Sequence, residues 1–141
     1  MKKNELPRGL RNNNPGNIRR SRDVFQGEVV NGRDRAFKQF RSMPHGYRAV
    51  FKILSNYYLM YGLTTIRKMI GRWAPENENN TAAYVSLVSS YSGIGPDDPL
   101  GFEREQMIRI VAGMSRVENG RDAVMSDVIA GWDLLQVGRY F

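Results

Sequence analysis

The stretch Phe102–Gly120, which reads FEREQMIRIVAGMSRVENG, decides how the rest of this 141-residue sequence is interpreted. Its apolar residues recur three and four positions apart, which is the pattern of a helix that buries one face. These residues are Met107, Ile110, Val111, Met114 and Val117. Asn119-Gly120 then supplies the left-handed cap that ends such a helix. The stretch therefore predicts an amphipathic helix that ends just after Glu118.

Glu118 continues the apolar stripe, because it lies four residues after Met114 and seven after Val111. Its side chain is therefore expected on the core-facing side of the helix. Burial and the negative end of the helix dipole both favour the protonated form of a carboxyl group. A general acid that works near neutral pH needs that form. The alternative is that Glu118 turns into solvent and pairs with Arg116 or Arg121.

Four further segments show the same helical periodicity, and glycine or proline ends three of them. The predicted helices span residues 47–61, 66–73, 84–91 and 125–135. Together with the helix that ends near Glu118, they indicate a mainly α protein with about five helices.

The N-terminal region shows no helical period. Asn12–Asn17 is rich in turn-forming residues, and Asn31-Gly32 between two short strand-like runs is a strong β-hairpin signal. We therefore expect a single α+β domain over residues 1–141, with loop and a small β-hairpin in residues 1–43 and helices in residues 44–141.

Composition excludes several classes of protein. No apolar run approaches the ~18 residues of a membrane span, and Met1-Lys2-Lys3 leads into polar residues rather than an apolar signal segment. There is no cysteine and a single histidine, His45, so disulfides and thiolate metal sites are excluded. We expect a protein with no membrane span, no signal peptide, no metal and no cofactor.

Positive charge is concentrated in the first third of the chain. Residues 1–48 contain twelve Lys and Arg against four acidic residues, whereas residues 49–141 contain nine against ten. This distribution predicts a polyanionic neighbour such as nucleic acid, a membrane surface or an anionic cell wall.

Several short motifs resemble, in the same order, those of phage and prophage proteins described as virion structural proteins. They are RGLRNNNPGNIR (residues 8–19), GYRA (46–49), RWAP (72–75), ENNT (78–81) with Tyr84, and ENG (118–120). The resemblance covers nearly the whole chain. It implies a phage-associated protein that is found in the virion or the host cytoplasm and has other virion proteins as partners.

Two of these motifs also resemble elements of bacterial glucosaminidases and lytic transglycosylases of the lysozyme-like superfamily. In those enzymes a helix ending in Glu-Ser-Gly carries the catalytic acid, and in the glucosaminidases an Asn-x-Phe-Gly-Ile-Lys loop and a β-hairpin follow it. Here Glu118–Gly120 is similar to the first element, and Asn14–Arg19 with the predicted hairpin is similar to the second, in reversed order. The resemblance implies a circularly permuted lysozyme-like fold that cleaves the glycan strand of peptidoglycan.

On this interpretation Glu118 is the acid, and a second group stabilises the transition state or activates water. The carboxylates of the predicted hairpin, Glu28 and Asp34, compete for that role. Glu28 is preferred because Asp34 lies beside Arg33 and Arg35 and is expected to be paired already.

Substrate contacts are assigned to amide, basic and aromatic side chains. Asn13, Asn14 and Asn17 are expected to bind N-acetyl groups, with turn formation as their alternative role. Arg19 and Tyr84 complete the expected binding set. The acidic and amide residues of the 78–81 motif are interpreted as a helix cap.

Two other interpretations stay open. A non-enzymatic virion or anti-host protein would bind nucleic acid or another protein through its basic N-terminal third, and sixteen Arg against five Lys suit phosphate recognition. A lysozyme-like fold that has lost its activity would keep only a structural role.

Overall fold

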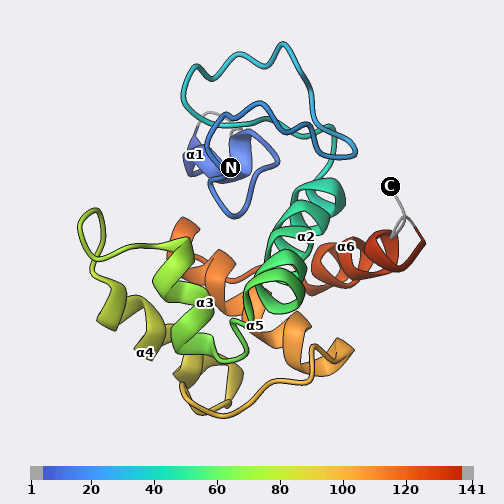
Figure 1. Ribbon diagram of the computed structural model, residues 1–141. Helices are drawn as coiled ribbons and strands as arrows, with labels where there is room; N and C mark the ends of the chain where they lie inside the picture. The colour runs from blue at the N-terminus through green and yellow to red at the C-terminus, as the bar shows by residue number, and fades with distance from the viewer. Residues whose placement is uncertain (1–4, 138–141) are drawn as a thin grey trace.

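The computed structural model describes residues 5–137, and within them the chain forms six helices joined by loops (Figure 1). They are α1 (Arg8–Arg11), α2 (Met43–Tyr61), α3 (Ile66–Trp73), α4 (Thr81–Ser92), α5 (Arg104–Asn119) and α6 (Met125–Val137). The prediction of a mainly helical protein is confirmed, and the five longer helices fall on the five predicted segments. Helix α1 was not predicted, because four residues are too few to show a period.

Local signals set the helix ends. The side chains that accept a backbone N–H at the start of α2, α3 and α4 are Ser42, Thr65 and Asn80. The residues that end α2, α4 and α5 in the left-handed conformation are Gly62, Gly93 and Gly120. These capping residues explain why the predicted and observed boundaries agree closely.

The predicted β-hairpin is wrong for the described residues, which contain isolated bridges instead of strands. One bridge joins Arg19 and Phe37, and the other joins Glu28 and Phe40. Asn31-Gly32 therefore lies inside a long loop and does not form a two-residue turn between paired strands.

Asp34 provides the physical reason. Its carboxylate accepts the backbone N–H groups of Ala36 and Phe37, and it pairs with Arg8 of α1 at 2.6 Å. These contacts hold residues 34–37 beside α1, and backbone pairing with residues 27–29 begins only at residues 39–41. The Asp34 carboxylate thus accepts backbone N–H groups that a β-ladder would otherwise use.

In the helical part (residues 43–137), α2 packs along α6, and α4 packs against α5 (Figure 1). The close approach of α6 to α2 requires a glycine, because a Cβ at Gly131 would lie 2.6 Å from Cβ of Tyr47. Nearby, the rings of Phe51 and Trp132 meet edge to face at 5.3 Å. No helix of the described residues has the length and apolar character that crossing a membrane requires.

The N-terminal lobe (residues 5–42) is fastened to the end of α5. Asn119 donates from Nδ2 to the carbonyl of Pro15 at 2.9 Å, although 104 residues separate them. A Cβ at Gly9 would lie 2.6 Å from Oδ1 of the same asparagine, so glycine allows α1 to sit directly on this helix end. The lobe and the Glu118 turn are therefore held together by buried contacts.

Candidate active site

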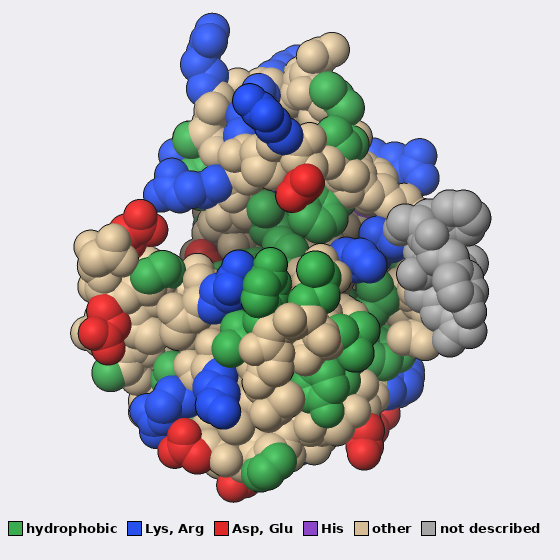
Figure 2. Space-filling model, in the orientation of Figure 1, with side chains coloured by type: hydrophobic (Ala, Val, Ile, Leu, Met, Phe, Trp, Pro, Cys, Tyr) green, Lys and Arg blue, Asp and Glu red, His purple; other side chains and the backbone are tan. Residues whose placement is uncertain are grey.

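A groove of about 410 Å³ lies between the N-terminal lobe and the helical part. Its lining residues are Gly16, Asn17, Ile18, Arg19, Phe37, Ile53, Tyr57, Trp73, Ala74, Glu78, Asn79 and Glu118. In the space-filling view a hollow separates the upper lobe, which bears many Lys and Arg side chains, from the helical part below (Figure 2). The groove therefore has walls from both halves of the chain.

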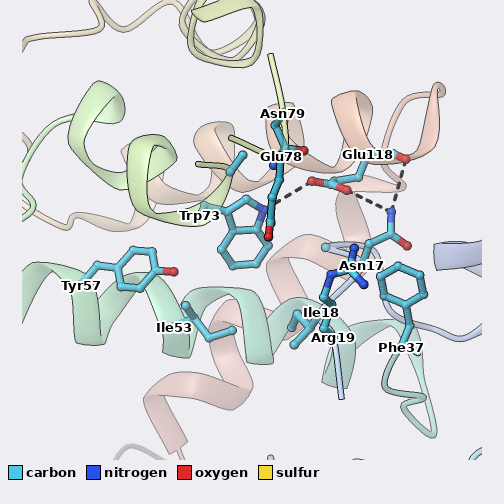
Figure 3. Close-up of a pocket in the computed structure, with 12 residues that line it drawn as sticks. Asn17, Ile18, Arg19, Phe37, Ile53, Tyr57, Trp73, Glu78, Asn79 and Glu118 are labelled. Atoms are coloured by element: carbon cyan, nitrogen blue, oxygen red, sulfur yellow. Dashed lines mark hydrogen bonds between the residues drawn. The ribbon is translucent and has the colours of Figure 1, made fainter. Parts of the chain in front are cut away.

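The Glu118 carboxyl group is half-buried in the groove, and three uncharged donors hold it, of which Figure 3 shows Asn17 and Trp73. Oε1 accepts from Nδ2 of Asn17 at 3.0 Å. Oε2 accepts from the Tyr84 hydroxyl at 2.8 Å and from Nε1 of Trp73 at 3.4 Å. The ion pairs formed by residues 5–137 do not include Glu118, and its neighbour Arg116 pairs with Asp122 instead.

Tyr84 lies behind Glu118 and is only 6% exposed. Burial raises the pKa of its phenol well above the usual value, and the negative charge of Glu118 adds to that effect. The phenol therefore keeps its proton and donates to the carboxylate. Because a hydroxyl can also accept, the same contact persists when Glu118 carries a proton. The site can accommodate both protonation states that acid catalysis requires.

The Asn-rich loop reaches Glu118 because its backbone is turned tightly. Asn17 adopts a left-handed conformation, with φ near 50°, which asparagine tolerates better than most residues. A Cβ at Gly16 would lie 2.8 Å from Val50 and 3.0 Å from the Trp73 ring, so only glycine lets the loop pass this close. The loop and Glu118 meet across 101 residues of sequence.

The predicted substrate-binding residues divide into two groups. Asn17 and Arg19 line the groove. Asn14 is fully buried and donates to the carbonyls of Ile18 and Lys38, and Asn13 donates to a carbonyl within the lobe. Asn13 and Asn14 do not line the groove, and they have the turn-forming role that was their alternative. Tyr84 does not line the groove either, because it is buried behind Glu118, to which it donates.

The two hairpin carboxylates are engaged elsewhere. Glu28 pairs with Nζ of Lys38 at 2.9 Å, and the same ammonium group donates to the carbonyl of Asp23 at 2.7 Å. Asp34 pairs with Arg8, whose hydrogen bond is the main cause that lowers the pKa of this carboxyl. Neither carboxylate is among the residues that line the groove. The structure therefore brings Glu118 to the Asn-rich loop but does not bring Glu28 or Asp34 into the groove.

Glu28→Gln is expected to lower the free energy of unfolding by about 3 kcal/mol, because Lys38 is 2% exposed and would lose its countercharge. Urea denaturation followed by circular dichroism measures the change. Glu76→Gln, at an exposed loop position, is the control. A fully stable Glu28→Gln protein that had lost glycan cleavage would instead return Glu28 to the catalytic set.

Comparison with known proteins places the chain in a family. No family model matches it. Over 129 residues it is 39% identical to Protein P5 of Pseudoalteromonas phage PM2, a match that covers 89% of this chain and 79% of P5. The chain belongs to the family of phage PM2 protein P5. This membership confirms that the protein is phage-associated, whereas a lysozyme-like relationship stays a prediction.

The similarity to P5 spans both walls of the groove. A matched segment that covers 89% of the chain leaves about one tenth of it outside, which is too little to omit either Asn17 or Glu118. The groove therefore lies within the region over which this P5-family protein and P5 are alike.

Sequence reasoning missed several lining residues, of which Glu78 is the most consequential. It belongs to the loop between α3 and α4, is exposed, and lines the same groove as Glu118. In the predicted capping cluster, Asn80 is the residue that caps α4 by accepting from the N–H of Ala83. Capping therefore uses Asn80 and leaves the Glu78 carboxylate without a role in the cap. That unused carboxylate was the signal by which Glu78 could have been identified as a site residue.

Proposed function

We propose that this P5-family protein cleaves the glycan strand of peptidoglycan, acting from the virion or inside the host cell as a glycosidase of lysozyme-like type. The observation that carries the proposal is the Glu118 carboxyl group. It lies in a groove, is oriented by three uncharged donors, and forms no ion pair with the described residues. A proton donor to a glycosidic oxygen needs this combination of access and fixed orientation.

Glu118 is assigned as the general acid. Its proton passes to the oxygen that links two sugars as the bond from that oxygen to the anomeric carbon breaks. The Tyr84 hydroxyl can donate to Glu118 before and after the transfer, because a protonated carboxyl group still accepts, and the proton to be transferred then points into the groove. The Trp73 side chain lines the groove, where a sugar ring can stack on its indole.

Glu78 takes the role that was predicted for Glu28. It and Glu118 are both carboxylates of one groove, which is the arrangement that two-carboxylate glycosidases use. As general base, Glu78 removes a proton from a water molecule whose oxygen bonds to the anomeric carbon, while the proton of Glu118 leaves with the released sugar. One product then carries the hydroxyl from water on its anomeric carbon, and the other carries the proton from Glu118 on its released oxygen. A lytic transglycosylase would need no second carboxylate, because a hydroxyl of the sugar itself attacks and Glu118, having given up its proton, accepts the proton of that hydroxyl.

Purified sacculi provide the direct test. Incubation with the protein is expected to release soluble glycan fragments, and mass spectrometry separates hydrated products from anhydro products, which are lighter by one water. Failure to release any fragment from sacculi of several Gram-negative hosts would contradict the proposed activity.

A second candidate function is binding of nucleic acid by the N-terminal lobe without catalysis. Arg19, Arg20 and Arg22 are exposed, and the ion pairs of the described residues include none of them. Such a cationic surface releases counterions from a phosphate backbone.

If this second function holds, replacing these three arginines with glutamine should weaken DNA binding at low salt by roughly 10- to 100-fold and flatten its salt dependence. Fluorescence anisotropy with a labelled duplex measures both quantities. Replacing Arg104 and Arg109 on α5 is the control, and an equal loss in that variant would argue against the lobe as the binding surface.

A further inference from the structure

Arg72 is held on two aromatic rings at the edge of the groove. Its guanidinium lies 4.0 Å from the ring centre of Tyr61 and 5.3 Å from that of Tyr57, both on α2. The side chain is at the C-terminal turn of α3 and is exposed. The ion pairs of residues 5–137 do not include it. Arg72 is therefore an ordered cation whose charge the described carboxylates leave uncompensated.

The position of Arg72 relates it to the groove. Its sequence neighbour Trp73 and its stacking partner Tyr57 both line the groove. In the close-up, Tyr57 lies at one end with its hydroxyl toward Trp73, and Phe37 lies at the other end beyond Glu118 (Figure 3). Arg72 is thus placed at the Tyr57 end.

The opposite end carries a similar pair. The guanidinium of Arg19 lies 5.2 Å from the centre of the Phe37 ring, and both residues line the groove. Each end of the groove therefore has an arginine stacked on an aromatic ring, with Glu118 and Trp73 between them.

Stacking on a ring fixes the plane of a guanidinium and leaves its N–H edge available. That edge matches a carboxylate, which it binds through two parallel hydrogen bonds. A neutral polysaccharide gives such a group no charge to pair with. A polymer with carboxylates at intervals would pair with both ends of the groove.

We propose that Arg72, held on Tyr57 and Tyr61, binds a substrate carboxylate, so that the groove selects glycans bearing carboxylates on both sides of the bond that is cut. This inference rests on the proposed glycan cleavage and names its substrate class. In peptidoglycan the carboxylates come from the stem peptides, or from the lactyl groups of the muramic acid residues once those peptides are removed.

The test compares three forms of one substrate: native sacculi, sacculi whose carboxyl groups are capped as neutral amides with carbodiimide, and glycan strands freed of peptides by an amidase. Initial rates of fragment release are measured for the wild type, Arg72→Gln, Arg72→Lys and the double variant Arg19→Gln/Arg72→Gln. Arg104→Gln removes an exposed arginine at the far end of α5 and is the matched control.

The wild type is expected to prefer native over capped sacculi by roughly tenfold, and Arg72→Gln should reduce this preference by about three- to fivefold. The double variant should abolish the preference. Arg72→Lys should retain part of it, and Arg104→Gln should retain all of it. If the rate on peptide-free strands still depends on Arg72, its ligand is the lactyl carboxylate. If the rate on those strands no longer depends on Arg72, its ligands are the peptide carboxylates.

Binding separates this inference from the proposed activity. Co-sedimentation with native and capped sacculi, in proteins that also carry Glu118→Gln, measures selection without cleavage. Equal binding and equal cleavage of the two substrates, or a preference that is undiminished in the Arg72→Gln variant, would overturn the inference while leaving glycan cleavage intact. If no protein cleaves sacculi, the proposed activity fails, and the binding comparison still decides whether Arg72 recognises carboxylates.

Discussion

Glu118→Gln is expected to slow glycan cleavage by roughly 10²- to 10⁴-fold while leaving the protein folded. Glutamine has nearly the same shape and keeps an oxygen that can accept from Tyr84 and Trp73, but it has no proton to deliver. The Asn17 amide can rotate to face the new NH₂ group, so the loop need not leave its place. Release of soluble fragments from sacculi measures the rate, and thermal unfolding reports the fold.

Glu105→Gln is the matched control for this experiment. Glu105 is on the same helix, but it lies at the first turn, is exposed, and pairs with the neighbouring Arg104. Its replacement should leave cleavage unchanged. If a folded Glu118→Gln protein cleaved sacculi at the wild-type rate, Glu118 would not be the acid, and that role would pass to Glu78, the other carboxylate that lines the groove.

Glu78→Ala is expected to slow hydrolysis by roughly 10²-fold or more, because the water molecule would lose its base. Sodium azide should restore much of the rate, since the small anion can enter the space left by the carboxylate and attack the anomeric carbon without needing a base. Mass spectrometry should then detect a glycosyl azide product. Because Glu78 is exposed, the stability of the variant should stay close to that of the wild type.

Glu76→Ala, two residues earlier in the same loop, controls for nonspecific effects because Glu76 is exposed and is not among the lining residues. Unchanged cleavage by Glu78→Ala, together with anhydro products, would show that Glu78 is not a base. It would indicate a lytic transglycosylase that uses one carboxyl group. The experiment therefore separates the two reaction types that a common acid can serve.

The helical part of the fold could be predicted because its signals are local. Apolar periodicity located the five longer helices, and caps such as Asn80 and Gly120 fixed their ends. The position of Glu118 on an apolar stripe also indicated that its carboxyl would be drawn toward the body of the protein. Its approach to the Asn-rich loop came from a resemblance, since no local signal links residues 101 positions apart.

The errors have a shared physical origin in long-range pairing between charged groups. Asp34 was expected to pair with adjacent arginines, but its partner is Arg8, 26 residues away. Glu28 was assigned to catalysis because its buried partner Lys38 could not be identified from sequence. Ion pairs and hydrogen bonds depend on which segments the fold brings together. The polar N-terminal region has no apolar periodicity from which these neighbouring segments could be predicted.

The contact between Asn17 and Glu118 also determines the stage of protein synthesis at which the site can form. The ribosome makes the Asn-rich loop early and the Glu118 helix end about a hundred residues later. At about 5 to 20 residues per second, roughly 5 to 20 s of synthesis separate the two walls. A nascent chain therefore presents only one wall of the groove until the Glu118 turn has been made.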